Sequence, residues 1–190
     1  MTERKDMNIQ ERLDQLREII QTDDFLEGKG LSNEVNIWLF CYDPKDEPII
    51  RHFTEQLEKN VMGHVHPRIC DLYRIFLSIC DAKRITDKIP VMEEKKGKDY
   101  LLEPLRRTAG SKAFVEKMKY EPHKKGDILV ITGVGDAFPF IRVHDLLNAM
   151  QPEFSDVPIL VFYPGVFDGY QLQLFSCLPK NSYYRAFNVI

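Results

Sequence analysis

Three groups of side chains in this sequence have types and spacings that could support chemistry, and the first is a glycine turn. Gly133 and Gly135 follow a strongly apolar run and precede a helical pattern. A phosphate-binding turn lies at such a place in α/β proteins, where backbone N–H groups face the ligand. Phe138, however, replaces the third glycine of the dinucleotide fingerprint, and the sequence contains no P-loop. The glycines therefore indicate a tight turn between a strand and a helix, with a degenerate nucleotide pocket as the alternative.

The second group is the histidine pair His64 and His66. The two residues alternate along a predicted strand, so both side chains would share one face of it. A pair with this spacing can ligate a metal ion such as zinc. No third ligand follows nearby, because His52, His123 and His144 are remote in the sequence. We therefore expect no bound metal and interpret the pair as edge-strand or interface histidines.

The third group consists of Arg142, His144 and Asp145, which open the predicted helix after the glycine turn. A histidine beside an aspartate can perform general acid-base catalysis. No serine or cysteine stands in a strained nucleophile elbow, however, and Cys177 is isolated. We expect no catalysis and no cofactor; these residues would instead form a hydrogen-bond network at the start of the helix.

Alternating apolar runs and helical spacings predict the elements that must position these residues. Five apolar runs predict strands at 35–42, 63–70, 127–132, 157–163 and 184–190, with Pro164-Gly165 ending the fourth. Helical spacings predict helices at 8–22, 46–60, 71–81 and 139–150, and a short aromatic helix at 170–177. The alternation is typical of an α/β three-layer sandwich around a mainly parallel five-stranded sheet. The commonest strand order for it is 2-1-3-4-5.

The segment 83–125 differs from the rest of the chain because it is polar, rich in charge and punctuated by proline and glycine. It carries 13 Lys and Arg against 7 Asp and Glu. We expect it to form two or three short helices inserted at the periphery. Its lysines alternate with glutamates, and only Tyr100, Phe114 and Tyr120 could stack on bases. A solvated helical face is the simpler interpretation, and nucleic-acid contact is the alternative.

Length and composition restrict the class of protein. A chain of 190 residues fits one domain, 1–190, and 44% hydrophobic with 29% charged residues is typical of a globular protein. The net charge of −3 provides no global basic field for nucleic acid. Charges run through the first residues, which excludes a signal peptide or membrane anchor there. The widely spaced Cys41, Cys70, Cys80 and Cys177 contain no CxxC pair, so we expect buried free thiols and a cytoplasmic location.

The C-terminal third is poor in charge and rich in aromatic residues. Residues 134–190 hold 3 Lys and Arg, and 11 of the 21 aromatic residues of the chain. Such a composition is typical of a dense core or of a surface that meets a partner.

Three stretches of the sequence together resemble the BrxB family of BREX bacteriophage-exclusion systems. The first is ITGVGDAFPFIRVHDLLNAMQPEFSDVPILVFYPGVFDGYQLQLF, the second is NSYYRAFNVI, and the third is LEGKGLSNEVNIWLFCYDPKDE. The resemblance covers nearly the whole chain and is weakest over 83–125. It implies a component of a bacterial defence system that restricts phage and methylates host DNA. The family has no assigned catalytic residues, and a methyltransferase, an ATPase and the phosphatase-like PglZ supply the recognised chemistry.

The resemblance thus implies a non-catalytic adaptor, with PglZ as the first partner and DNA reached only through the complex. The turns after Thr132 and Tyr163 would emerge on one edge of a parallel sheet and form the contact surface. We expect Phe162 inside the core, and the loop residues of the surface partly exposed. The expected partner-binding residues, which surround Gly165, are Asp136, Phe138, Arg142, His144, Phe167, Asp168, Tyr170, Tyr183 and Arg185. The alternative is an ion pair between Arg142 and Asp168 that only braces the two loops.

Overall fold

A mainly parallel sheet organises the chain, which the computed structural model describes over residues 7–28, 36–60, 62–183 and 185–190. Its principal strands are β1 (Ile37–Tyr42), β2 (His66–Asp71), β3 (Asp127–Thr132), β4 (Ile159–Phe167) and β7 (Phe187–Asn188). They lie in the order β2-β3-β4-β1-β7, and all four pairings along this path are parallel. The predicted α/β class and parallel sheet are therefore confirmed.

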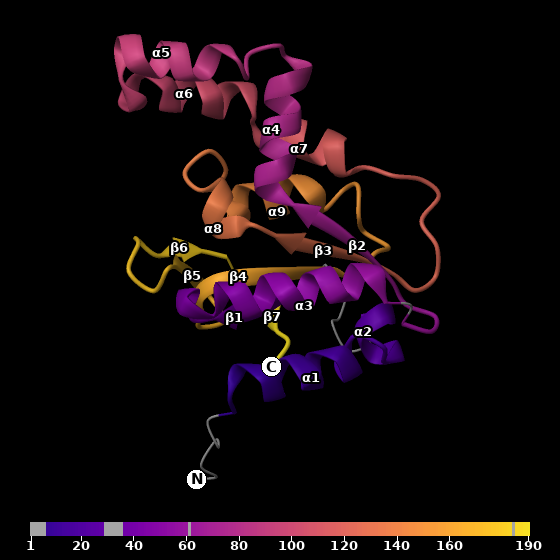
Figure 1. The fold of residues 1–190 in the computed structure, drawn as a ribbon. Coiled ribbons are helices and arrows are strands. Elements are labelled where there is room, and N and C mark those ends of the chain that lie inside the picture. The colour runs from indigo at the N-terminus through magenta and orange to yellow at the C-terminus, as the bar shows by residue number, and fades with distance from the viewer. Residues whose placement is uncertain (1–6, 29–35, 61, 184) are drawn as a thin grey trace.

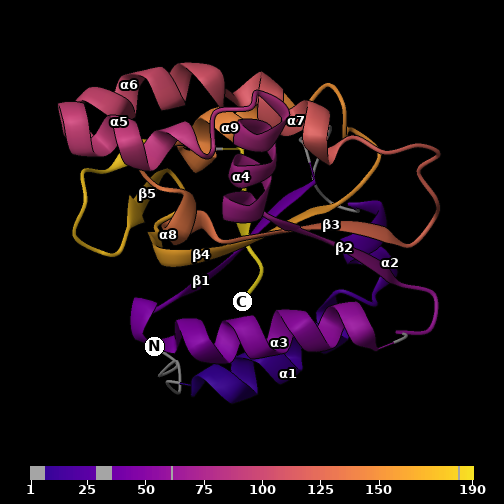
Figure 2. The ribbon, with the colours of Figure 1, turned by 45° about the horizontal axis from the view of Figure 1, so that its top comes forward.

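Helices cover both faces of the sheet (Figures 1 and 2). One face carries α1 (Ile9–Ile19), α2 (Asp23–Glu27) and α3 (Glu47–Lys59), the last preceded by the short 3-10 helix η1 (Pro44–Asp46). The other carries α4 (Leu72–Ala82), α7 (Ser111–Met118) and α9 (Val143–Met150).

Alternation along β3 explains the two cores. Ile128 and Val130 pack into the cluster with α1 and α3, whereas Leu129 and Ile131 pack into the cluster with α4, α7 and α9. A strand that is apolar at every position fits only between two helical layers, because successive side chains point to opposite faces.

The expected strand order was wrong for the first strand. β1 lies between β4 and β7, and not between β2 and β3. Helix α3 carries the chain from β1 past β4 and β3 to the far edge of the sheet. The chain then returns through β2, β3 and β4, and the helices that connect these strands pack on the other face. Hydrophobic spacing predicts the type and length of each element but not which strands pair, so the sequence pattern could not predict the strand order.

The two edges of the sheet are short or interrupted. The backbone N–H of His66 bonds to the Gly126 carbonyl oxygen at 2.8 Å, so the alternate residue Pro67 faces away from β3 at the outer edge, where its missing N–H costs nothing. At the other edge β7 has two residues, instead of the seven predicted at 184–190. The predicted first and last strands also include Val35 and Tyr184, which lie outside the described residues.

The fourth strand does not end at Pro164-Gly165 as expected. β4 continues to Phe167 and turns into β5 (Gln171–Leu174), which pairs with it antiparallel and then with β6 (Asn181–Ser182). The predicted helix at 170–177 is therefore wrong. A Cβ atom on Gly165 would lie 2.2 Å from the carbonyl oxygen of Gln173, so this hairpin closes because position 165 carries no side chain.

The charged segment forms the predicted helices, α5 (Lys88–Lys96), α6 (Lys98–Thr108) and α7. Helices α5 and α6 lie side by side and project beyond the end of α4 (Figures 1 and 2). No residue of α5 is buried. By contrast, α7 buries Phe114, Val115 and Met118 in the layer over the sheet. The expectation that the whole segment is peripheral was therefore wrong for α7.

Candidate partner-binding site

The carboxyl ends of β1 to β4 meet at one edge of the sheet, as expected for parallel strands, and two depressions lie there. The short helix α8 (Val134–Ala137) lies between them: Val134 lines one depression, and Gly133 and Asp136 line the other. The predicted helix at 139–150 begins later, at Val143, because the stretch around Pro139 forms a loop after α8.

The first depression is an apolar cavity of about 120 Å³. Its walls come from the end of β4, from the loop between α8 and α9, and from the β5–β6 segment. Its lining residues are Val134, Phe138, Ile141, Arg142, Val143, His144, Tyr163, Leu172, Leu174, Leu178, Pro179 and Asn181. The structure therefore brings the predicted Phe138, Arg142 and His144 against the C-terminal segment.

Arg142 is exposed at the rim of this cavity. It precedes α9, whose first turn receives no side-chain hydrogen bond from it, and it has no ion-pair partner in the described part of the chain. His144 Nε2 lies 3.3 Å from Asp145 Oδ1. At this rim Arg142 is thus a cation whose charge is left to solvent or to a partner.

The bracing pair between Arg142 and Asp168 is not formed. Asp168 Oδ1 instead accepts hydrogen bonds from the backbone N–H groups of Tyr170 at 2.9 Å and Gln171 at 2.7 Å. These bonds hold the pKa of the Asp168 carboxyl below its ordinary value, with a smaller effect from Lys180, whose Nζ lies 3.9 Å away. Asp168 therefore organises its own hairpin turn.

Exposure separates the predicted aromatic residues into two sets. Tyr170 at the tip of the β4–β5 hairpin is 74% exposed, and Val166, on the face of the hairpin opposite Phe167, is 47% exposed. Phe167 and Tyr183, which we expected partly outside, are only 7% and 3% exposed. Phe167 pairs with Leu172 on the inner side of the hairpin, where both side chains enter the core. Burial correspondingly raises the pKa of the Tyr183 hydroxyl.

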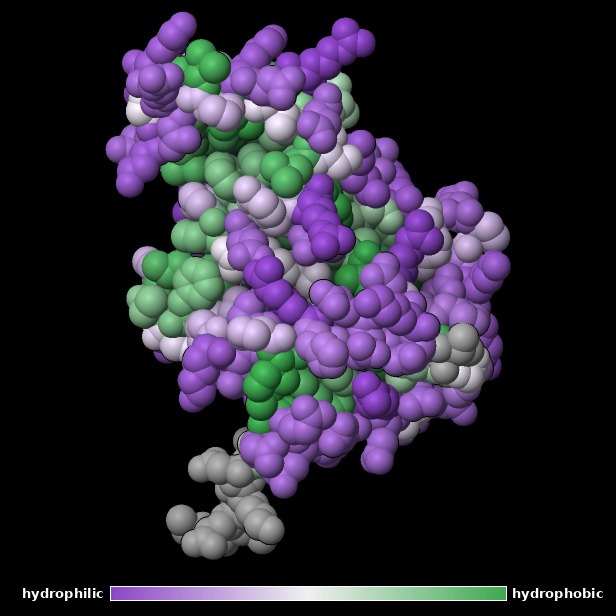
Figure 3. Space-filling model, viewed as in Figure 1, coloured by the Kyte–Doolittle hydropathy of each residue, from purple (hydrophilic) through white to green (hydrophobic). Residues whose placement is uncertain are grey.

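We use the name edge surface for the apolar cavity together with Arg142 and Tyr170. Figure 3 shows a hydrophobic area over the β4–β5 hairpin on this side of the molecule, while hydrophilic residues dominate over α5 and α6. Arg185 is also exposed, and it donates a hydrogen bond to Gln151 Oε1 at 2.7 Å beyond the end of α9.

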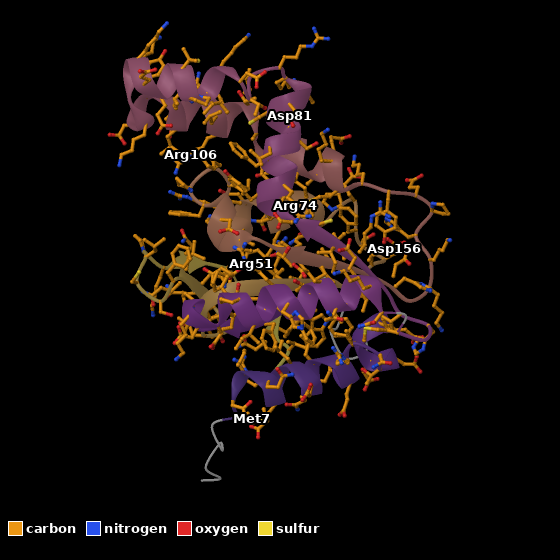
Figure 4. The ribbon with its side chains drawn as sticks, in the orientation of Figure 1. Met7, Arg51, Arg74, Asp81, Arg106 and Asp156 are labelled. Carbon is orange, nitrogen blue, oxygen red and sulfur yellow. The ribbon has the colours of Figure 1, made fainter. Side chains whose placement is uncertain are left out.

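The second depression is polar, and the predicted Asp136 belongs to it. Asp136 forms an ion pair with Arg51 of α3, which also binds Glu47 at 3.0 Å. The Tyr42 hydroxyl donates to Glu47, and burial followed by this carboxylate raises the pKa of Tyr42. Figure 4 shows Arg51 on α3 and Arg74 on α4 on the two sides of this crevice. The sequence analysis missed these arginines, although the Glu47–Arg51 spacing in a predicted helix was the available signal.

Close packing accounts for the glycine turn. Gly133 has a left-handed backbone with φ +68°, and a Cβ there would lie 3.1 Å from Asp71 Oδ1. A Cβ on Gly135 would lie 2.9 Å from the ring of Phe175. Five carboxylates and two guanidinium groups line the crevice at this turn, so its net negative charge repels phosphate; these residues are Glu47, Glu55, Glu58, Asp71, Asp136, Arg51 and Arg74. The arrangement supports the tight turn, and not the nucleotide pocket.

The histidine pair does not share a strand face, because His64 lies in a turn before β2. His66 Nδ1 lies 3.4 Å from Asp127 Oδ1. Within the described ranges no group of three or more His, Cys, Asp or Glu residues is arranged to hold a metal ion. In the same ranges no helix has the length and apolar character needed to cross a membrane.

The four cysteines are free thiols. Cys70 and Cys80 are buried, Cys41 is half-buried and Cys177 is exposed, so the expectation of buried thiols was wrong for Cys177. Burial raises the pKa of Cys70 to about 11 and that of Cys41 to about 12, which keeps both protonated and unreactive near neutral pH.

The fold and the site define the class of this protein. It is a mainly parallel α/β protein with an apolar cavity and an exposed hairpin at the carboxyl ends of its strands. A family model described as BREX protein BrxB matches residues 68–189. A BREX protein BrxB from Bacillus cereus is 36% identical over 187 residues, which cover 96% of this chain and 97% of the relative. A BREX protein BrxB from Escherichia coli is 27% identical over 180 residues, covering 94% and 90% of the two chains. The chain belongs to the BrxB family, and no solved structure matches it.

Proposed function

We propose that this chain is a non-catalytic adaptor of a BREX phage-defence system that binds another BREX protein, with PglZ as the first candidate. Membership of the BrxB family supports a role within BREX. The single observation that carries the binding role is the edge surface, where an apolar cavity, an arginine with no ion pair among the described residues and an exposed tyrosine lie on one edge of the sheet.

These groups have the chemistry of a protein interface. Tyrosine and arginine are enriched among the residues that contribute most to binding, because each combines a large contact area with directed hydrogen bonds. Tyr170 is held at the tip of a hairpin whose turn is fixed by Asp168, so its side chain is presented to solvent by an ordered backbone. A presented side chain loses less conformational entropy on binding than one in a loose loop.

The absence of catalysis in this proposal rests on how the titratable groups of the edge are used. Asp136 is bound by Arg51, and Asp168 is bound by backbone N–H groups. His144 faces Asp145, but neither Ser nor Cys is among the described residues that line the cavity beside them. These interactions give the charged groups structural roles and leave the apolar surface for a partner.

The test is co-purification from cells that carry the whole defence system, with the accompanying proteins identified by mass spectrometry. We expect PglZ to be retained, and Arg142→Glu to weaken its binding by about 2 kcal/mol or more. Lys59→Glu is the matched control, because Lys59 is also exposed but lies at the end of α3, outside the basic segment 83–125. A folded Arg142→Glu protein that still binds PglZ and still supports phage defence would exclude this interface.

A second candidate function is contact with nucleic acid through α5, α6 and α7. It is favoured by the separation of charge: residues 83–125 carry a net charge of +6, while the whole chain carries −3, so the other residues sum to −9. A basic segment on an acidic body draws a polyanion to one place.

A further inference from the structure

The apolar cavity of the edge surface has the dimensions of one side chain. Its volume is about 120 Å³. A dry protein cavity of roughly 150 Å³ holds one benzene molecule. This space therefore accepts a leucine, isoleucine or methionine side chain and is too small for an indole ring or a longer apolar segment.

The walls of the cavity are set by packed and turn residues. Leu172 and Leu174 of β5 are 1% and 8% exposed, and Tyr163 at the end of β4 is 2% exposed. Next to Leu174, Phe175 and Ser176 both adopt left-handed backbone conformations with φ +54° and +56°. Such conformations are costly for residues other than glycine, and here they turn the chain so that Leu178 returns to the cavity.

The rim favours a negative charge on the occupant. Arg142 lines the cavity, is exposed and has no ion-pair partner among the described residues. It lies at the N-terminus of α9, where the helix dipole adds positive potential. Neither nearby carboxylate is among the described residues that line the cavity: Asp145 Oδ1 lies 3.3 Å from His144 Nε2, and Asp168 accepts two backbone hydrogen bonds.

We propose that the edge surface recognises a short peptide segment of its partner in which an apolar residue stands beside an Asp or Glu. The apolar side chain enters the cavity, and the neighbouring carboxylate pairs with Arg142. Tyr170 at the tip of the hairpin supplies adjoining contact area, because its side chain is 74% exposed. This inference rests on the proposed adaptor function and adds the chemistry of the recognised segment.

Two variants separate the cavity from the charge. Leu178 is half-buried and lines the cavity, so Leu178→Phe fills the space without placing a larger group in the sealed core. Leu178→Met keeps the volume and is its control. Arg142→Glu reverses the rim charge, and Lys59→Glu is again the control on α3. Urea unfolding of each variant shows whether it is folded.

The experiment uses overlapping synthetic peptides that cover the BREX protein retained in co-purification, with binding followed by fluorescence anisotropy. We expect a peptide with Leu, Ile or Met next to Asp or Glu to bind, and about tenfold or greater weakening by Leu178→Phe and by Arg142→Glu. The peptide with Lys in place of its acidic residue would lose binding to the unmodified chain and regain it with Arg142→Glu.

Two outcomes would overturn the inference while the adaptor function stands. One is retention of the intact partner with no dependence on Leu178→Phe or Arg142→Glu in folded protein. The other is a bound peptide that lacks an acidic residue or whose charge reversal is not rescued. If no BREX protein is retained at all, the proposed function itself fails.

Discussion

Strand β4 and helix α5 show how differently two regions of this chain contribute to the molecule. Eight of the nine residues of β4 are buried, whereas none of the residues of α5 is. β4 lies between β3 and β1 and sends side chains into both cores. α5 instead contacts the core only through partly buried side chains, among them Ile89 and Met92. The comparison indicates that β4 stabilises both cores, while the paired helices α5 and α6 add a charged surface.

The charges follow the same division. In the stretch from the end of α4 to the start of α7, most cations have no ion pair among the described residues: Lys83, Arg84, Lys88, Lys95, Lys96, Lys98, Arg107 and Lys112. The C-terminal third carries few cations, and its aromatic groups mostly fill the core. Removal of apolar atoms from the C-terminal third should therefore lower stability. Removal of charge from α5 and α6 should instead affect binding.

The largest expected effect is the loss of a ring from the central strand. Phe162 is 1% exposed and packs against Phe40 and Phe53, with ring centroids 5.5 and 6.0 Å away. We expect Phe162→Ala to lower the free energy of unfolding by about 3–5 kcal/mol, because it removes a buried apolar ring and leaves a cavity. Val91→Ala on α5, where the side chain is 48% exposed, should change it by less than about 0.5 kcal/mol. Urea titration measures both, and similar losses would contradict the comparison.

A smaller but still large effect is expected at the β4–β5 hairpin. A Cβ on Gly165 would meet the Gln173 carbonyl oxygen at 2.2 Å, so Gly165→Ala must open the hairpin. We expect about 2 kcal/mol of destabilisation and weaker partner binding, since the edge surface includes this hairpin. Gly110→Ala is the control, because its nearest neighbour would be 3.8 Å away. Unfolding and co-purification are measured together, and an unchanged Gly165→Ala protein would refute the close approach.

This hairpin also shows why part of the site could not be predicted. The dipeptide Pro164-Gly165 is a strong turn signal, yet tertiary pairing with β5 overrides it and extends the strand. The strict alternation Gln171-Leu172-Gln173-Leu174 is a strand signal, which the interpretation of 170–177 as an aromatic helix overlooked. The burial of Phe167 and Tyr183 depends on that pairing, so the local sequence could not predict it.

What could be predicted depended on local pattern. The apolar runs of β1, β3 and β4 exist because both faces are covered, and that requirement is written in consecutive residues. The place of Phe138, Arg142 and His144 at the carboxyl edge followed from parallel topology alone. The Arg51–Asp136 pair could not be found this way, because it joins helices 85 positions apart in the chain.

A third effect concerns charge on the paired helices and tests the nucleic-acid candidate. If the second candidate function holds, a double-stranded DNA fragment binds, and the combined variant K83Q, R84Q, K88Q and R107Q binds it about tenfold more weakly. The slope of log affinity against log salt should fall by about 0.9 for each phosphate that the variant no longer neutralises. Arg142→Gln should leave that slope unchanged, as Arg142 lies at the edge surface. Equal slopes for all proteins would remove nucleic acid from the functions of these helices.

The smallest expected effect is a pH dependence in the hairpin turn. Backbone N–H groups of Tyr170 and Gln171 hold the pKa of Asp168 below its ordinary value. A carboxyl whose pKa is lowered by folding contributes stability above its unfolded pKa of about 3.9 and loses it as pH falls through the lower folded pKa. Asp168→Asn should therefore flatten the fall of the urea midpoint at acid pH. Near neutral pH the midpoint should change little, because most of the stability there comes from the buried core. Asp43→Asn is the control outside the edge surface, since its pKa is also lowered, there by Lys45. A matching loss at pH 7 and at pH 3 would show that Asp168 acts through the shape of the turn and not through its charge.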